Sequence, residues 1–317
     1  MLQNLLEPAV LCFALGVLAG ILGSNIRLPE ALYETLSIYL LLAIGLKGGV
    51  DLAKTGIVEA GPAVIAAALS GAALPLLAYP VLRMGRLDKP NAAALAAHYG
   101  SVSAVTFAVC LTFLDREGVP YESYVAVLLA FMEIPALAVG IMLARRGSGR
   151  KSGYAEAARE ILLGKGVYFL IVGLIVGYVA GPVRAESLEP VFFTPFKGVL
   201  ALFLLEMGLV ASRRLRDIVR LGPFLLAFGT MWPLFSGALG ALLGLVLGLS
   251  VGGAAVLATL AASASYIAAP AAMRLAVPEA NPSIYLTTAL GVTFPFNIIW
   301  GIPVYLWMAR TIQGLIG

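Results

Sequence analysis

Long apolar runs, each about the length of a membrane-spanning helix, follow one another along this chain. A helix needs about twenty mostly apolar residues to cross the hydrocarbon core of a bilayer, and proline, glycine or charge clusters mark the breaks between such runs. The pattern therefore predicts an all-α integral membrane protein of about ten transmembrane helices. The expected spans are residues 8–24, 31–50, 61–82, 92–114, 121–144, 161–181, 191–211, 222–249, 253–275 and 283–311.

Composition excludes a water-soluble fold, because 61% of the 317 residues are hydrophobic and only 12% are charged. Soluble domains are about 45–50% apolar and about 25% charged, so this chain has too few polar residues to cover a surface in water. The net charge of +4 does not indicate a nucleic-acid partner, since the basic residues lie in short clusters between apolar runs. Cys12 and Cys110 lie inside apolar runs without the spacing of a metal site, so we interpret both as packing residues.

The distribution of lysine and arginine predicts the topology, because these residues are retained in cytoplasmic loops. Fifteen of the 21 basic residues follow odd-numbered helices, and six lie on the opposite side. This bias places both termini outside a bacterial plasma membrane and the central linker in the cytoplasm. The N-terminus carries Glu7 and no basic segment before its first apolar run, so no cleaved signal peptide is expected.

Five landmarks of the first half recur in the same order in the second half, 160 to 163 residues later. An odd number of helices in each repeat forces the second copy to insert upside down, and inverted repeats are typical of secondary transporters. We expect a five-helix repeat at 1–144, a cytoplasmic linker at 145–160 and an inverted five-helix repeat at 161–317. The matched positions are Ile44-Gly45-Leu46 with Met207-Gly208-Leu209, Gly61-Pro62 with Gly222-Pro223, Ser101 and Ser103 with Ser263 and Ser265, Pro120 with Pro282, and Pro135 with Pro295.

The fourth apolar run of each half is interrupted, by glycine and hydroxyl residues before Thr106 and by serines before Pro270. Both runs are predicted to be helices broken midway, and Pro270 fits the first turn of a restarted helix because it has no amide to leave unpaired. A half-helix start exposes N–H groups and a partial positive charge, so two facing starts would bind a small oxyanion without lysine or arginine. The alternative is that these serines and glycines only allow close helix packing. Their matched position in both halves favours a binding site.

Four motifs resemble the sodium-dependent bicarbonate transporter family of cyanobacteria and other bacteria. They are Gly100-Ser-Val-Ser-Ala-Val-Thr106, Val119-Pro-Tyr-Glu122, Phe131-Met-Glu-Ile-Pro-Ala-Leu137 and Asn281-Pro-Ser-Ile-Tyr285. The resemblance implies two inverted five-helix repeats, a core domain that moves against a gate domain, and an anion held between the half-helix starts with sodium beside it. It also implies a homotrimer and a PII-like regulatory protein at the cytoplasmic side. The implied substrate-binding residues are Gly100, Ser101, Ser103, Ala104, Thr106, Ser263, Ala264 and Ser265.

The chain departs from this family pattern mainly at the second break. Tyr266 stands where cyanobacterial members have an aspartate that helps to hold sodium, and Ala264 stands where they have a third serine. These departures affect the expected sodium coupling more than the expected anion transport. The candidate residues for coupling an ion are Ser103, Ser265, Tyr266, Glu133 and His98.

Glu133 and His98 are the ionisable candidates. A carboxylate inside a bilayer is costly and therefore often functional, whereas a lone histidine is more often a packed, hydrogen-bonded residue, although it can titrate near neutral pH.

These patterns predict a secondary transporter for bicarbonate or a similar small anion, working by alternating access of the elevator type. A passive anion channel is one alternative, and an intramembrane enzyme is another. Catalysis would need a positioned base or a metal cluster, and the sequence offers only His98 close to Ser101. No enzyme activity and no cofactor are expected; sodium is the one ion considered, and membrane lipid surrounds the chain.

Overall fold

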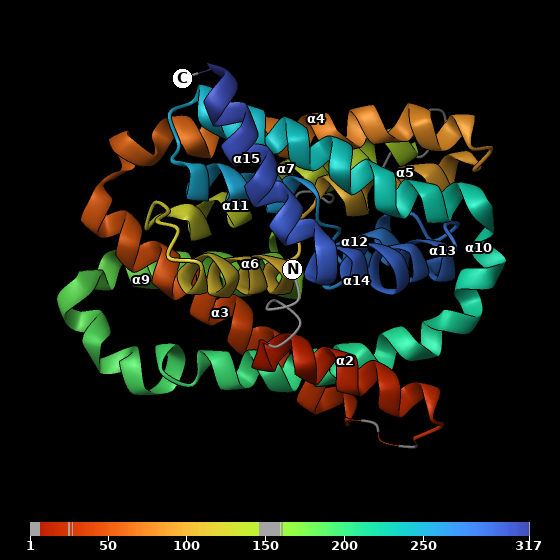
Figure 1. The fold of residues 1–317 in the computed structure, drawn as a ribbon, viewed down its shortest axis with the longest axis horizontal. Helices are drawn as coiled ribbons and strands as arrows, with labels where there is room; N and C mark the ends of the chain where they lie inside the picture. The colour runs from red at the N-terminus through yellow and green to blue at the C-terminus, as the bar shows by residue number, and fades with distance from the viewer. Residues whose placement is uncertain (1–6, 25, 27, 146–158, 160, 317) are drawn as a thin grey trace.

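The computed structural model describes residues 7–24, 26, 28–145, 159 and 161–316, apart from the side chains of residues 215, 216, 219 and 220. Every regular element in this part of the chain is helical (Figure 1), so the predicted all-α class is confirmed. Most of the predicted linker at 145–160 lies outside the described residues.

Most of the long helices coincide with predicted apolar runs, but a single helix, Phe196–Val246, covers most of two of them, 191–211 and 222–249. The elements are α2 (Pro8–Ile21), α3 (Glu30–Thr55), α4 (Ile57–Met84), α5 (Lys89–Gly100), α6 (Ala104–Arg116), α7 (Val125–Arg145), α9 (Lys165–Ala185), η1 (Glu186–Leu188), η2 (Glu189–Phe193), α10 (Phe196–Val246), α11 (Val251–Ala261), α12 (Ala268–Ala276), α13 (Pro282–Leu286), η3 (Thr287–Thr293), α14 (Phe294–Phe296), η4 (Asn297–Gly301) and α15 (Ile302–Ile316).

Within the described residues, seven helical stretches are long and apolar enough to cross a membrane. The chain is therefore a multi-pass membrane protein, but this number does not confirm the predicted ten spans. Two segments, Pro8–Ile21 and Val251–Ala261, are too short to meet the length criterion, and Lys165–Arg214 counts as one stretch of 50 residues. At a rise of 1.5 Å per residue such a stretch is about two and a half times as long as the hydrocarbon core is thick.

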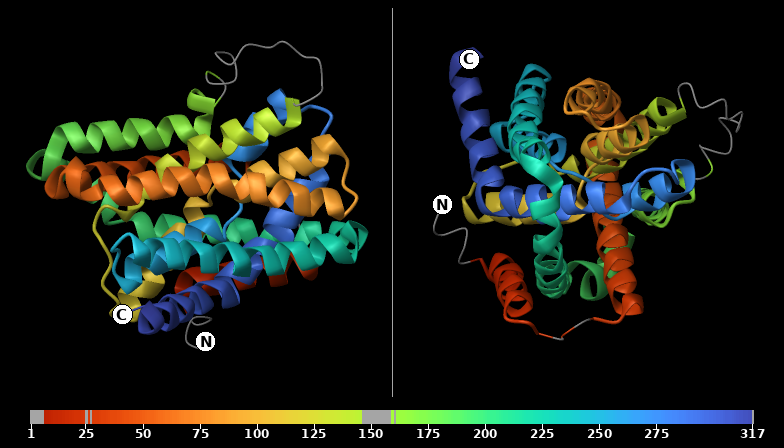
Figure 2. Two further views of the ribbon diagram at one scale, coloured as in Figure 1. Left: turned by 90° about the horizontal axis from the view of Figure 1, so that it is seen from above. Right: turned by 90° about the vertical axis from the view of Figure 1, so that its right-hand side faces the viewer.

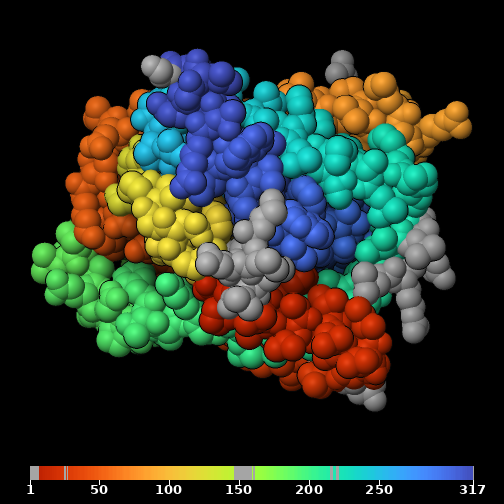
Figure 3. Space-filling view, viewed as in Figure 1, coloured from red at the N-terminus to blue at the C-terminus, as the bar shows by residue number. Residues whose placement is uncertain are grey.

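One group of helices, which we call the first layer, consists of α2, α3, α9 and α10 up to residue 222. In Figure 1 and in the right view of Figure 2, α2 and the first part of α10 lie at the lower side of the molecule, below most of the remaining helices. In the space-filling view α2 (red) and the α9–α10 region (green) form the lower edge, with residues 89–116 (yellow) and 282–316 (blue) packed above (Figure 3). The second layer consists of these remaining helices.

Glycines allow the helices of the first layer to pack with their backbones in contact. A Cβ atom on Gly173 of α9 would lie 3.0 Å from the Cα of Gly45 in α3, and a Cβ atom on Gly208 of α10 would lie 2.9 Å from the Cα of Gly16 in α2. Small residues at such contacts are the usual means of close packing between membrane helices. The first layer is thus built from two glycine-paired helix contacts.

The chain passes between the two layers at two glycines with left-handed backbone. Gly56 joins α3 to α4 with φ 92° and ψ 149°, and Gly222 breaks α10 with φ 76° and ψ 165°. Only glycine adopts this region without strain. The repeat pairs Gly61 with Gly222, but the backbones of these two glycines differ, because Gly61 lies inside α4 with no positive φ.

The connections between helices lie at two opposite ends of the molecule. The α4–α5 turn (orange) and the bend at residue 222 (teal) lie at one end in the left view of Figure 2, whereas the α9–α10 connection (green) and the α10–α11 turn (cyan) lie at the other. Helices that run between opposite ends are the arrangement that a membrane requires.

Candidate functional site

The first predicted break is confirmed between α5 and α6. Helix α5 ends at Gly100 and α6 begins at Ala104, with extended backbone at Ser103. Ser103 caps the start of α6, because its Oγ accepts hydrogen bonds from the Thr106 N–H (3.1 Å) and the Thr106 hydroxyl (2.9 Å). Serine is among the strongest N-cap residues. Gly100 is required by space, since a Cβ there would collide with the ring of Pro75.

The second predicted break is confirmed between α11 and α12. Helix α11 ends at Ala261 and α12 begins at Ala268. Ser265 stabilises the restart, because its Oγ accepts a hydrogen bond of 3.1 Å from the N–H of Ala269. Pro270 lies in the first turn of α12, as its missing amide predicted.

The two breaks cross and bind each other directly. The N–H of Ser265 donates to the carbonyl of His98 at 2.9 Å, and the N–H of Ser103 donates to Ser263 Oγ at 2.9 Å. The starts of α6 and α12, with their partial positive charges, therefore meet at this crossing. Among the described residues, Ala104 N–H and Val105 N–H have no hydrogen-bond partner, and Ala104 lines a cavity at the crossing.

Glu133 on α7 ties the two breaks together. One carboxylate oxygen accepts from the Ser101 hydroxyl at 2.7 Å and from the Ser265 hydroxyl at 3.4 Å, and the other accepts from the Val102 N–H at 3.1 Å. The side chain is buried, and none of the ion pairs formed by the described residues includes it. A carboxylate placed here offsets the positive ends of the two half-helices.

A small cavity lies beside the crossing, between the two layers. Measured as the space open to the centre of a water molecule, its volume is about 20 Å³, so the cavity is large enough to hold water. Ser103 and Ala104 at the start of α6, together with Ser265, Tyr266 and Ala268 at the start of α12, line the second-layer side. The remaining lining residues are Val102, Leu129, Glu133 and Ile267 of the second layer and Leu41, Gly166 and Leu170 of the first.

Of the eight predicted substrate-binding residues, three line this cavity: Ser103, Ala104 and Ser265. The other five belong to the crossing but do not face the cavity: Gly100, Ser101, Thr106, Ser263 and Ala264. Two of them stabilise the site through hydrogen bonds. Ser101 donates to Glu133, and Ser263 accepts from the N–H of Ser103.

A larger cavity borders the small one. Leu41, Gly166, Tyr266 and Ile267 line both the small cavity and a second cavity of about 680 Å³, measured in the same way. The larger cavity, which we call the vestibule, also contains basic side chains at Lys165, Arg214 and Arg274. A third cavity of about 370 Å³, lined by Ala108 and Ile44 among others, shares no lining residue with the small one.

His98 is packed rather than directed into the cavity. Its ring is fully buried, its Nδ1 forms a hydrogen bond of 2.6 Å with the carbonyl of Ala94, and it stacks on Tyr285 with ring centroids 4.3 Å apart. It contributes its carbonyl, not its imidazole, to the crossing. Ser101 donates to Glu133 rather than to His98, so the pair considered for an enzyme does not form a nucleophile and base here.

The residues of the first-layer wall were missed by sequence reasoning. Leu41, Gly166 and Leu170 carry no polar group, and nothing in their local sequence distinguishes them from packing residues. Gly166 allows α9 to approach the start of α12, since a Cβ on it would lie 2.6 Å from the Ala268 Cβ. Asn297 was also missed; it supports the second break by donating to the carbonyl of Ala262 at 2.9 Å. No group of three or more His, Cys, Asp or Glu residues suited to a metal ion occurs among the described residues.

Comparison with known protein families gives one match that covers most of the chain. The model of the Na+-dependent bicarbonate transporter superfamily matches residues 8–310. No curated protein sequence matches the chain.

Proposed function

We propose that this chain, which belongs to the Na+-dependent bicarbonate transporter superfamily, is a secondary transporter that binds bicarbonate or a similar small anion where its two broken helices cross. The observation that carries this proposal is the pair of hydrogen bonds between the breaks, which brings the starts of α6 and α12 together. Half-helix starts at the middle of a membrane protein are a recurrent way to bind an anionic group. The free amides of Ala104 and Val105 would supply the main donors.

Alternating access of the elevator type is supported by the position of the site between the two layers. The polar groups that line the small cavity come from the second layer, whereas the first layer supplies an apolar wall of Leu41, Gly166 and Leu170. Movement of one layer against the other would carry the site from the vestibule toward the opposite side. Gly56 and Gly222, where the chain crosses between layers, would absorb the change in backbone direction.

The inverted repeat is part of the same proposal, and repeated local structure supports it. Asp88 caps α5 and Ser250 caps α11, each by accepting a backbone N–H, and these residues are 162 positions apart. The two glycine contacts of the first layer are related in the same way. Gly45 of the first half packs against α9 of the second half, and its repeat partner Gly208 of the second half packs against α2 of the first half. On this interpretation the 50-residue stretch is two spans, and the chain has ten.

The resemblance also leads us to propose a homotrimer in the bacterial plasma membrane and a PII-like regulatory partner at the cytoplasmic side. Both termini are proposed to lie outside. The ion pair between Glu7 and Arg116 at the end of α6, 3.6 Å long, is consistent with this orientation, since the loop after α6 was assigned to the outside.

The purified protein in lipid vesicles should take up labelled bicarbonate with saturable kinetics. Preloading the vesicles with unlabelled bicarbonate should accelerate uptake of the label, because a carrier exchanges substrate across the membrane whereas a pore does not. A scan of small anions in the same vesicles would identify the preferred substrate. Absence of saturable uptake for every anion would overturn the proposed function, and uptake without counterflow would favour a channel.

The topology should appear in the labelling of single cysteines placed at two exposed positions. Lys89 lies at the start of α5 and Ser187 lies in the turn after α9, at opposite ends of the molecule. In a background lacking Cys12 and Cys110, a membrane-impermeant maleimide added to intact cells should label Ser187→Cys and not Lys89→Cys. Labelling of both variants before lysis would contradict the inverted arrangement. Labelling of Lys89→Cys alone would mean that the chain lies in the membrane in the opposite orientation.

A further inference from the structure

We infer that the hydroxyl group of Tyr266 donates a hydrogen bond to the transported anion, an inference that rests on the proposed function. The Tyr266 side chain is only 5% exposed. Its hydroxyl is buried and has no hydrogen-bond partner among the described residues. Buried polar groups are nearly always hydrogen-bonded, and a buried tyrosine hydroxyl usually finds a partner. A buried hydroxyl without one, facing a cavity, points to a ligand.

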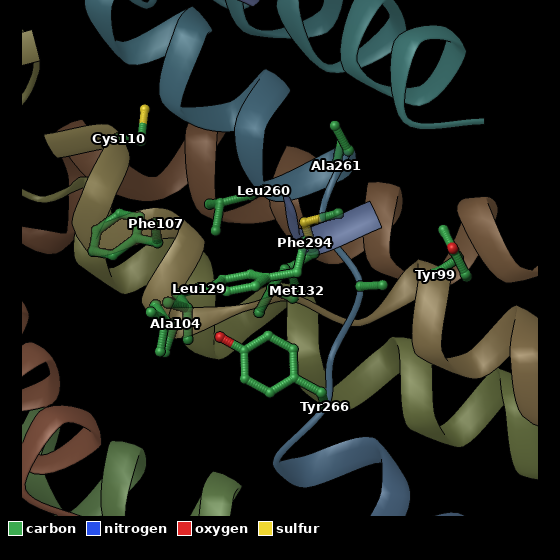
Figure 4. Close-up of a cluster of buried hydrophobic side chains, with 14 of the residues drawn as sticks. Tyr99, Ala104, Phe107, Cys110, Leu129, Met132, Leu260, Ala261, Tyr266 and Phe294 are labelled. Carbon is green, nitrogen blue, oxygen red and sulfur yellow. The ribbon is translucent and has the colours of Figure 1, made fainter. Parts of the chain in front are cut away.

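The hydroxyl is directed toward the start of α6. Figure 4 shows the Tyr266 oxygen pointing to Ala104, while the ring packs edge-on against Phe294 with centroids 5.2 Å apart. The Ser103 side chain lies near the hydroxyl, but no hydrogen bond joins the two groups, and Ser103 Oγ accepts two hydrogen bonds from Thr106. The packing on Phe294 therefore holds the hydroxyl toward the cavity without supplying a partner.

Tyr266 and Ala104 both line this cavity, and the Ala104 amide, like the Tyr266 hydroxyl, has no hydrogen-bond partner among the described residues. A small oxyanion such as bicarbonate offers several acceptor oxygens and can accept from both groups. The phenol is uncharged at neutral pH and adds a donor without adding charge. A carboxylate at this position would instead repel the anion unless a cation accompanied it. Tyr266 is thus suited to bind the anion without an accompanying cation.

The small size of the cavity suggests that the Tyr266 ring moves when the anion enters. The space open to the centre of a water molecule is only about 20 Å³, and on this inference the site widens when an anion binds. The Tyr266 ring borders both this cavity and the vestibule of about 680 Å³. A small rotation of the ring toward the vestibule would admit the anion and keep the hydroxyl in contact with it.

The test is Tyr266→Phe, which removes the hydroxyl and keeps the ring that packs on Phe294. Uptake of labelled bicarbonate into vesicles should show a KM raised about 10-fold to 100-fold, as expected for loss of a hydrogen bond to a charged group. The kcat should change much less. Tyr39→Phe is the matched control, since Tyr39 donates to the carbonyls of Val191 and Phe192 at 2.8 and 3.1 Å, away from the site, and its KM should equal that of wild type.

An unchanged KM in Tyr266→Phe, with saturable uptake in the wild type, would overturn this inference and leave the proposed function standing. Absence of uptake in the wild type would instead reject the proposed function. If Tyr266→Phe does not assemble, Tyr266→Gln, which keeps an N–H donor, is compared with Tyr266→Leu, which does not. A lower KM in the Gln variant supports the inference, and equal values overturn it.

Discussion

Replacing either Ser103 or Ser265 with leucine should abolish anion uptake while the protein still assembles in the membrane. Both side chains line the small cavity, so a leucine at either position would fill the space between the two half-helix starts. Ser103→Leu would also remove the cap of α6, and Ser265→Leu would remove an acceptor of the Ala269 N–H. Uptake in vesicles reports the loss, and size-exclusion elution in detergent reports assembly.

The corresponding alanine variants should be milder, because much of the stabilisation of the anion would come from backbone amides. Ser103→Ala should lower stability by about 1 kcal/mol through loss of the cap. Ser236→Leu is a control, since Ser236 is a buried serine of α10 that faces a separate cavity, and we expect it to retain uptake. Full activity in both site Leu variants would place the binding site elsewhere.

Uptake by the wild type should depend weakly on sodium or not at all. Sodium prefers oxygen ligands, and Tyr266 offers neither a negative charge nor a compact ligand where the family resemblance implies an aspartate. Loss of a carboxylate from a buried cation site weakens binding by several kcal/mol, in line with about 3 to 5 kcal/mol for breaking a buried charge pair. Among the described residues, Glu133 is the one carboxylate that lines the small cavity, and its oxygens already accept hydrogen bonds from both breaks.

Uptake should therefore be measured with an inward sodium gradient, an inward potassium gradient and a pH step, in the wild type, Tyr266→Asp and Glu133→Gln. Sodium dependence that is gained only in Tyr266→Asp would support the prediction. Loss of the response to pH in Glu133→Gln would show that Glu133 carries a proton with the anion. Steep, saturable sodium dependence in the wild type would refute the prediction, and its loss in Glu133→Gln would then assign sodium to Glu133.

Local sequence determined the membrane class, the breaks and the restarts of the broken helices. Apolar runs must be helical in lipid, because each backbone group needs a partner within its own segment. Ser103 as a cap and Pro270 in a first turn act within one turn of helix, so their effects could be predicted without tertiary information. The number of spans was less accessible, since α10 continues past residue 222 and α2 is short.

Only the tertiary structure decided which of these side chains face the cavity. The breaks are about 160 residues apart in sequence, and their crossing depends on the packing of both layers rather than on local propensity. That packing turns Ser103 and Ser265 into the cavity, buries His98 against Tyr285, and directs the Tyr266 hydroxyl to the start of α6. It also supplies an apolar wall from Leu41, Gly166 and Leu170, whose role depends on helix rotation and close approach, which no local pattern encodes.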